Sequence, residues 1–410
     1  MFEKLSDIFI AAAEKYLTAV DANPGKSNQH EIGGLKKAGI ADLIGYPENG
    51  GKYHIPVTMV YIDSDGHEPI ICEDKMSWYD TRFNQAHRSP EFRLYYRSNE
   101  VTERMREGDF FLIALTQDNS LLVVITAPSS DTEKQLRVIF GALSVYSDNT
   151  LRKIPIDESS LIAPVRLMLA ELGIEFYAKS DSDGDLLDRI LNKFGATFPK
   201  TKVFSDFSRT ILEDRYSAIE QPDDALLAWM DYEERLFRIL ERHIVSERLK
   251  TGFGKTGHDV DEFIQFSLSV QNRRKSRVGH AFENHITEIL IQNKVQFEKG
   301  VYTEGKQKPD FLFPGRDAYL DSSFNQNRLF MLAAKTTCKE RWRQVLAEAE
   351  KIRVKHLITL EPSISEDQTK QMRAHMVQLV VPKPIQETFT AQQKADLVSL
   401  LEFINNIKEF

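Results

Sequence analysis

The chain has 410 residues, of which 41% are hydrophobic and 28% are charged, and its formal net charge is −8. This balance excludes an intrinsically disordered chain, and the length is enough for about two or three domains. The negative net charge also excludes a uniformly cationic protein, so binding to nucleic acid would need local basic clusters.

Cysteine usage and hydropathy indicate the compartment. Cys72 and Cys338 lie far apart in the sequence, which argues against a disulfide framework or a cysteine-rich zinc site and fits a reducing environment. No apolar run reaches the roughly 20 residues that cross a bilayer. Acidic residues occur throughout the first 17 positions, unlike a cleaved signal peptide. We expect a cytoplasmic protein with no membrane partner.

The first region is predicted to be rich in β-structure. An amphipathic helix is expected at residues 4–20 and a shorter helix at 135–143. Several predicted strands lie at regular spacing between these two helices. This spacing favours a small barrel or sandwich. The predicted strands are residues 55–62, 68–73, 92–97, 109–115 and 120–126.

The second region changes from helices to an alternation of helices and strands. Helical periodicity extends over residues 161–172, 186–194, 204–219 and 224–249. Further helices are expected at residues 259–270, 277–293, 339–352, 367–374 and from 391, and strands at 310–313, 329–335, 356–360 and 377–381. This alternation predicts a mixed or parallel sheet that helices cover on both faces.

These patterns predict a chain of two domains in the α+β or α/β class. A β-rich domain is expected at residues 1–178 and an α/β domain at 201–410. Residues 179–200 are expected to link the two, because they begin with the polar stretch KSDSDGD.

The residues that indicate chemistry lie in the C-terminal region. Asp310 opens one predicted strand and Lys335 ends the next, as in nucleases of the PD-(D/E)xK type. In such a site two carboxylates hold Mg²⁺, and the lysine stabilises the attacked phosphate or orients the water. A carboxylate normally stands two residues before the lysine, on the same face of the strand. This chain has Ala333 there.

A second acid must then come from elsewhere. Glu348, on the helix predicted to follow, can point into the vacant ligand position, and Glu340 and Glu350 compete with it by proximity alone. The same residues also fit an ordinary surface. A lysine at the end of a strand is usually solvated, and Glu348 can pair with Lys351 on a helix face.

Three longer segments resemble a known family. Residues 272–286 (NRRKSRVGHAFENHI), 308–315 (KPDFLFPG) and 331–352 (MLAAKTTCKERWRQVLAEAEKI) closely resemble the catalytic domain of EcoRII-like type II restriction endonucleases. The resemblance implies a restriction-endonuclease-like core in a Mg²⁺-dependent homodimer that cuts double-stranded DNA at a short palindrome such as CCWGG or CCNGG. The catalytic positions that it implies are Asp310 and Glu348 as metal ligands, Lys335, and the further acid Glu283.

The resemblance also implies two segments that contact DNA. In one, an arginine can bond guanine and a neighbouring carboxylate can accept from cytosine. On a helix at residues 339–352, Arg341 and Glu348 would lie two turns apart on one face. A basic cluster would contact phosphates, although a solvated helix start is the ordinary alternative. The base-reading residues are Lys339, Glu340 and Arg341, and the phosphate contacts are Arg273, Arg274 and Arg277.

The N-terminal region resembles, more loosely, the effector domain of the same family, which is a B3-like pseudobarrel that binds DNA. The resemblance rests on residues 27–45 and 77–97, where arginines are interleaved with aromatic side chains. It implies that this domain binds a second copy of the site and masks the catalytic cleft until then. The candidate contacts are His30, Lys36, Lys37, Arg82, Arg88, Arg93 and Arg97.

Other functions stay open from the sequence. A DNA-binding regulator would have kept the fold and lost cleavage, but it would not need all three catalytic positions. A modification-dependent nuclease would read altered cytosine through its N-terminal domain. A strand transferase would use Tyr319 as a covalent nucleophile, but no Arg-His-Arg set accompanies this tyrosine. His285, on a predicted helix, is expected to be structural and not a general base.

Overall fold

A computed structural model describes most of the chain. The described residues are 5–22, 30–63, 69–85, 87–142, 149–154, 183–212, 215–255, 257–304, 307–338 and 341–409. The helix predicted at residues 161–172 lies outside these ranges. The chain forms two compact units, Glu3–Ala178 and a second unit made of Lys179–Pro362 and Glu366–Phe410. No helix in the described ranges is long and apolar enough to cross a membrane.

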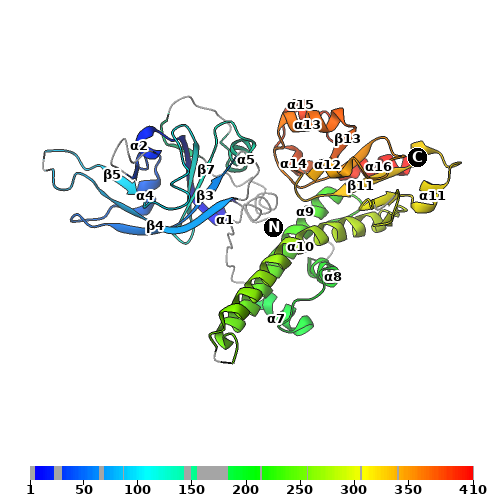
Figure 1. The fold of residues 1–410 in the computed structure, drawn as a ribbon, viewed down its shortest axis with the longest axis horizontal. Coiled ribbons are helices and arrows are strands. Elements are labelled where there is room, and N and C mark those ends of the chain that lie inside the picture. Colours follow the sequence, from blue (N-terminus) through cyan, green and yellow to red (C-terminus); the bar gives the residue numbers. More distant parts are fainter. Residues whose placement is uncertain are drawn as a thin grey trace. The chain divides into compact units, whose positions relative to one another are not determined.

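The N-terminal unit is built on one curled sheet (Figure 1). The sheet has the strand order β2-β5-β4-β3-β7-β6-β1-β8, and its neighbours are antiparallel except for the parallel pair β3 and β7. Its strands are β1 (Phe9–Tyr16), β2 (Glu31–Ile32), β3 (Tyr53–Ile62), β4 (Ile70–Asp80), β5 (Phe92–Tyr95), β6 (Phe110–Thr116), β7 (Leu121–Thr126) and β8 (Arg152–Ile154). Its helices are α1 (Leu5–Ile8), α2 (Ala19–Ala22), α4 (Ile40–Ile44) and α5 (Asp131–Phe140).

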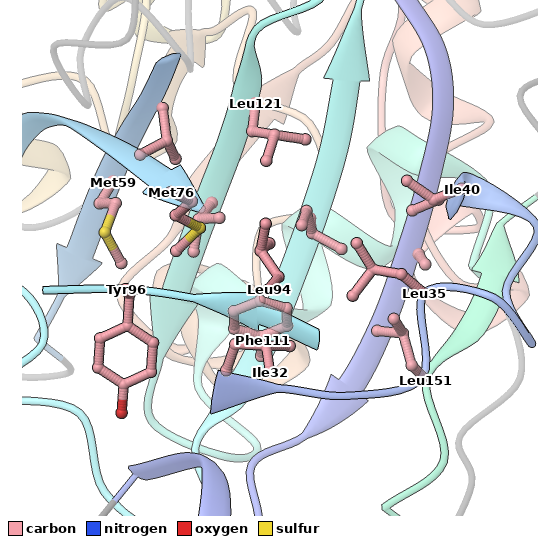
Figure 2. Close-up of a cluster of buried hydrophobic side chains, with 14 of the residues drawn as sticks. Ile32, Leu35, Ile40, Met59, Met76, Leu94, Tyr96, Phe111, Leu121 and Leu151 are labelled. Carbon is pink, nitrogen blue, oxygen red and sulfur yellow. The ribbon is translucent and has the colours of Figure 1, made fainter. Parts of the chain in front are cut away.

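The central strands β6 and β7 are buried along their whole length. Alternate side chains of β6 enter two different hydrophobic clusters, because successive residues of a strand point to opposite faces. Phe111 and Ile113 join the cluster that Figure 2 shows, which fills the inside of the curled sheet. Phe110 and Leu112 join a second cluster with Leu136 of α5. The β-rich character predicted for this region is confirmed, and the B3-like pseudobarrel stays a prediction.

The helix predicted at residues 4–20 is wrong for most of its length. The segment FIAAAEKY forms strand β1, which pairs with β6 and β8. Ala12 enters one hydrophobic cluster, and Ala11 and Ala13 enter the other. Alanine favours a helix in isolation, but its small side chain also fits a strand packed on both faces. Pairing within the sheet therefore overrides the local preference.

The C-terminal unit combines long helices with a five-stranded sheet of order β13-β12-β11-β10-β9. Its strands are β9 (Glu298–Lys299), β10 (Phe311–Phe313), β11 (Phe330–Ala334), β12 (Lys355–Ile358) and β13 (Val377–Val380). The β9–β10 and β10–β11 pairs are antiparallel, and the β11–β12 and β12–β13 pairs are parallel. The predicted mixed sheet is therefore confirmed.

Four helices precede this sheet and seven short helical segments follow β10 in the described ranges. The first four are α7 (Asp183–Phe194), α8 (Thr201–Leu212), α9 (Pro222–Thr251) and α10 (Val260–Gln292). The later ones are α11 (Arg316–Leu320), the 3₁₀ turn Gln326–Arg328, α12 (Trp342–Val345), α13 (Glu366–Ala374), α14 (Lys383–Gln386), α15 (Ala391–Lys394) and α16 (Leu400–Glu409). Figure 1 shows α9 and α10 side by side in green.

Two predictions about these helices need correction. The helices predicted at residues 259–270 and 277–293 are one continuous helix, α10, which begins at the capping residue Asp259. The segment predicted as a linker contains α7. Phe194, at the end of α7, packs against Phe204 and Phe207 of α8, and Asp183 pairs with Arg235 of α9 at 2.9 Å. This helix therefore belongs to the C-terminal unit.

Candidate active site

Asp310 and Lys335 lie side by side at the ends of two neighbouring strands inside the sheet. Asp310 comes directly before β10, and Lys335 comes directly after β11, which is the antiparallel neighbour of β10. The Asp310 Oδ2 atom accepts from Lys335 Nζ at 2.9 Å and from the Ala334 backbone N–H at 2.8 Å. Because the two side chains are still 19% and 22% exposed, respectively, the pair can be reached from solvent.

The strand position of Ala333 explains why a second acid would have to come from another element. Its side chain is fully buried on β11, so the strand offers no carboxylate at the position two residues before Lys335. A charged group at this point of the core would be costly without a partner. A second acid near Asp310 must come from another element.

Glu348 supplies that acid from a turn after α12. Burial first, and then the nearby charge of Asp310, raise the pKa of its carboxyl group to about 7 against the opposing effects of Lys335 and Lys355. Its Oε2 atom is buried without a hydrogen-bond partner. A buried carboxylate oxygen without a donor, close to a second carboxylate, is a suitable ligand for a cation.

The set of carboxylates is small. No group of three or more His, Cys, Asp or Glu side chains that could hold a metal ion occurs among the described residues. Asp310 and Glu348 nevertheless fit Mg²⁺, because this ion is usually held by one or two carboxylates, several waters and substrate phosphate. The orphaned Oε2 atom of Glu348 is the structural sign of that fit.

Glu283 pairs with a lysine other than Lys335. It lies on α10, and its Oε2 atom pairs with Lys299 of β9 at 2.9 Å. Strand β9 borders β10, so Lys299 connects Glu283 to the edge of the sheet next to Asp310. No direct contact of Glu283 with the Asp310–Lys335 pair is seen within the described residues.

Tyr319 is not placed as a nucleophile. Its ring is buried, its hydroxyl group donates to Glu304, and the hydroxyl oxygen accepts from the Lys351 backbone N–H at 3.1 Å. Burial and the hydrogen bond to Glu304 raise the pKa of this phenol, which opposes formation of a reactive phenolate. The geometry therefore disfavours the strand-transferase hypothesis.

His285 lies within a polar network and not at the candidate site. It is fully buried on α10, 2.9 Å from Glu233 and 2.8 Å from Arg209. Burial lowers the pKa of its imidazole group despite the charge of Glu233. These contacts fit the expectation that this histidine is structural.

The three arginines of the predicted basic cluster have different surroundings. Arg273 is exposed and stacks on Phe198 at 4.7 Å. Arg274 is partly exposed and binds the buried carboxylate of Glu241, with its Nε atom 2.8 Å from each oxygen. Arg273 is thus well placed to meet a phosphate, whereas Arg274 would have to leave Glu241.

Arg277 departs furthest from the prediction that the basic cluster contacts DNA phosphates. It is 5% exposed, its guanidinium stacks on Phe237 at 4.2 Å, and it pairs with Glu233 at 3.0 Å and with Glu234. A continuous helix turns this residue inward onto α9. Arg277 is therefore not available to a DNA phosphate in this conformation.

The predicted base-reading segment is only partly described. Lys339 and Glu340 lie outside the described residues. Arg341 is exposed and forms the N-cap of α12. The expectation that Arg341 and Glu348 share one helix face is wrong, because α12 ends at Val345 and the chain then turns.

The candidate residues of the N-terminal unit also differ in exposure. Arg82 and Arg93 both pair with Glu91, which neutralises part of their charge. His30 is half-buried beside the rings of Tyr95 and Tyr96. The exposed cationic residues are Lys36, Lys37, Arg88 and Arg97.

Lys355 is a residue near Glu348 that was not predicted from the sequence. This lysine opens β12, is 6% exposed, and donates from Nζ to the carbonyl oxygens of Glu348 and Ala349. A lone lysine before a short apolar strand usually indicates a solvated strand end. No signal in the sequence therefore singled it out.

The C-terminal region is similar in sequence to a known family. Residues 237–404 match the family model described as EcoRII C terminal. Over 184 residues the chain is 43% identical to the type II restriction enzyme EcoRII of Escherichia coli, and the match covers 45% of each chain. The chain thus matches less than half the length of this curated relative.

Two solved structures show a weaker likeness. Metal-depleted Ecl18kI in complex with uncleaved DNA has a TM-score of 0.44 and 19% identity, covering 56% of this chain and 84% of that chain. The complex of the restriction endonuclease PspGI with substrate DNA has a TM-score of 0.39 and 14% identity, covering 58% and 97%, respectively.

The sequence match shows that the C-terminal region is similar to a type II restriction endonuclease. The part that is similar, residues 237–404, matches the family model of the EcoRII C terminus. The predicted resemblance is confirmed for this region.

Proposed function

We propose that this protein is a sequence-specific type II restriction endonuclease that hydrolyses phosphodiester bonds in double-stranded DNA. The observation that carries the proposal is the convergence of Asp310, Lys335 and Glu348 within a region homologous to EcoRII. Two carboxylates and a lysine, gathered where solvent reaches the ends of the strands, are the groups that metal-assisted phosphodiester hydrolysis needs.

The proposed cofactor is Mg²⁺, held by Asp310 and Glu348. When bound, it polarises the phosphodiester and lowers the pKa of the attacking water. Lys335 leaves its ion pair with Asp310 far enough to neutralise charge on the attacked phosphate or to orient the water. Glu283 tunes the site indirectly by holding Lys299 at the neighbouring strand.

We further propose that DNA is recognised on both strands by a homodimer. A palindrome has two-fold symmetry, so two copies of one chain can read its halves identically. Lys339, Glu340 and Arg341 would read G·C pairs, since Arg341 is exposed at the start of α12. Arg273 would contact a phosphate, and Arg274 would do so after exchanging its partner Glu241. A CCWGG or CCNGG site is the first candidate.

The N-terminal unit is proposed to be a B3-like effector domain that binds another copy of the site. Its exposed cationic residues, including Arg88 and Arg97, can meet the phosphate backbone. This domain would hold the enzyme inactive until DNA binds, which requires DNA to bind the active state more tightly than the inactive one.

The test is cleavage of unmethylated plasmid DNA that carries several CCWGG sites. We expect discrete fragments in Mg²⁺, none in EDTA, and none from Lys335→Ala in either. Arg328→Ala, an exposed arginine outside the site, serves as the matched control and should cut normally. Binding without cutting on this DNA would contradict the proposal. Cutting of methylated DNA alone would instead support a modification-dependent nuclease, and no cutting of either DNA a regulator.

A further inference from the structure

Glu348 stands on an irregular turn. The turn begins where the Glu348 backbone N–H donates to the Val345 carbonyl at 3.1 Å, and it closes where Ile352 donates to Ala349 at 2.9 Å. Between these bonds Ala349 adopts a left-handed backbone with a φ of 47°. This conformation is unfavourable for a residue other than glycine, so surrounding contacts must hold it.

Lys355 provides the first of these contacts. Its ammonium group is buried, and Nζ lies 2.5 Å from the carbonyl oxygens of both Glu348 and Ala349. Lys355 is the first residue of β12, which pairs with β11 and β13 in the sheet. A buried ammonium group is costly unless it is well partnered. The carbonyl oxygens of the turn accept hydrogen bonds from this ammonium group. The lysine side chain and the turn therefore hold each other in place.

A second anchor comes from the chain on either side of Asp310, through Tyr319 after it and Glu304 before it. The Tyr319 hydroxyl oxygen accepts from the Lys351 backbone N–H at 3.1 Å, and the Tyr319 carbonyl accepts from Lys351 Nζ at 2.7 Å. Glu304 accepts from the Glu350 backbone N–H at 3.2 Å. The end of the turn is thus tied to α11, while its beginning is tied to β12.

We propose that Lys355 is a positioning residue of the nuclease site, which holds the turn so that Glu348 and Asp310 can bind one divalent cation together. This inference rests on the proposed function only in naming these two acids as ligands. Lys355 acts through backbone carbonyls and touches no reacting atom. Its effect should therefore appear in cation affinity and in the chemical step, and not in the binding of DNA.

The experiment measures the binding of Mn²⁺ to the full chain by calorimetry, without DNA. Lys355→Met removes the ammonium group with little change in volume, and Lys355→Arg keeps a cation with several donors. We expect Lys355→Met to weaken Mn²⁺ binding by about 10–100-fold, the usual effect of losing a group that orients a ligand. Lys355→Arg should recover at least part of the affinity.

Lys15→Met is the matched control, because Lys15 is also buried but pairs with Asp21 in the N-terminal unit. It should lower thermal stability and leave Mn²⁺ affinity unchanged. If Lys355→Met does not fold, Lys355→Gln takes its place, because its shorter, uncharged amide is polar enough for this site but cannot donate to both carbonyls. In the cleavage assay, kcat should fall with Mn²⁺ affinity, whereas KM for DNA should stay close to that of the wild type.

The outcomes separate this inference from the proposed function. Equal Mn²⁺ affinity in the wild type and in a folded Lys355→Met or Lys355→Gln overturns the positioning role. A wild type that binds no Mn²⁺ overturns it as well, because the cation site itself is then absent. A wild type that binds Mn²⁺ but does not cut DNA refutes the nuclease proposal, while the comparison of variants still decides the role of Lys355.

Discussion

Glu348 makes the candidate site sensitive to pH. Its carboxyl group has a pKa of about 7, raised first by burial and then by the charge of Asp310. A protonated carboxyl group cannot serve as a metal ligand, so protons and Mg²⁺ compete for it. Below pH 7 the affinity for Mg²⁺ should fall about tenfold for each pH unit, as for the binding of one proton.

This competition predicts how cleavage depends on pH. At subsaturating Mg²⁺ the rate should rise from pH 6 to pH 8 and then level off. Saturating Mg²⁺ should move the rise to lower pH, because the cation displaces the proton. Initial rates on a supercoiled plasmid at several Mg²⁺ concentrations would test this, with circular dichroism to verify folding at each pH. A profile that does not move with Mg²⁺ would contradict the assignment of Glu348.

Two arginines of one helix should behave in opposite ways. Arg277→Met leaves Glu233 and Glu234 without their buried cation and should lower the free energy of unfolding by about 3–5 kcal/mol. Arg273→Ala removes an exposed side chain that stacks on Phe198, and should lower stability by no more than about 1 kcal/mol. It should instead weaken DNA binding and reduce the slope of log affinity against log salt by about one.

Urea titration and DNA binding at several salt concentrations measure the two effects. Wild-type stability in Arg277→Met would show that the ion pairs with α9 do not hold this helix. An unchanged salt slope in Arg273→Ala would show that it contacts no phosphate. The sequence could not separate these residues, because a basic run looks the same whether solvated or buried. The acids that turn Arg277 inward lie on a different helix, more than 40 residues earlier.

At the scale of elements, strand spacing predicted the closeness of Asp310 and Lys335 better than helix propensity predicted the segment after them. Asp310 and Lys335 flank neighbouring strands, and strand pairing alone brings them together. The helix expected at residues 339–352 is reduced in the described residues to α12, which has four residues. Local preference for a helix is strong in VLAEAEK, but Lys355 binds carbonyls that helix continuation would have used. A tertiary contact thus overrides propensity.

The left-handed residue in this turn gives a prediction at the same scale. Ala349→Gly should be tolerated, because glycine adopts a positive φ without strain. Ala349→Val should lower the free energy of unfolding by about 2 kcal/mol or more, since a β-branched residue resists this backbone and the site is fully buried. It should also reduce cleavage, because Glu348 is the adjacent residue.

Thermal unfolding and cleavage rates of the two variants test this expectation. Ala347→Val, at an exposed position earlier in the same turn, serves as the control for adding a β-branched side chain. Equal behaviour of Ala349→Gly and Ala349→Val would mean that the turn is not held in its left-handed conformation in solution.

At the scale of the whole molecule, each unit has a core of its own. The N-terminal unit has two hydrophobic clusters, one on each face of its curled sheet. In the C-terminal unit, α9 and α10 pack together beside the sheet, and α7 is bound to α9 through Asp183 and Arg235. The two units divide between residues 178 and 179, where the character of the sequence changes, although that change did not reveal that α7 belongs to the second unit.

This organisation allows a test of the proposed inhibition. A chain of residues 179–410 keeps α7 and should fold by itself, with one cooperative transition in urea. On a plasmid with a single site, it should cut at least about tenfold faster than the full chain, which corresponds to about 1.4 kcal/mol of inhibition removed. The full chain should regain this rate when an oligonucleotide duplex with a second site is added.

The shorter chain should not respond to the added duplex, because the domain that would bind it is absent. The lysine variant Lys335→Ala of both chains excludes a contaminating nuclease. If both wild-type chains cut the single-site plasmid equally fast, the N-terminal unit does not inhibit. If only the full chain cuts, this unit contributes instead to binding or to assembly, and the proposed masking of the active site is refuted. A faster shorter chain that ignores the second duplex is the result that masking requires, since relief of inhibition then depends on the N-terminal unit alone.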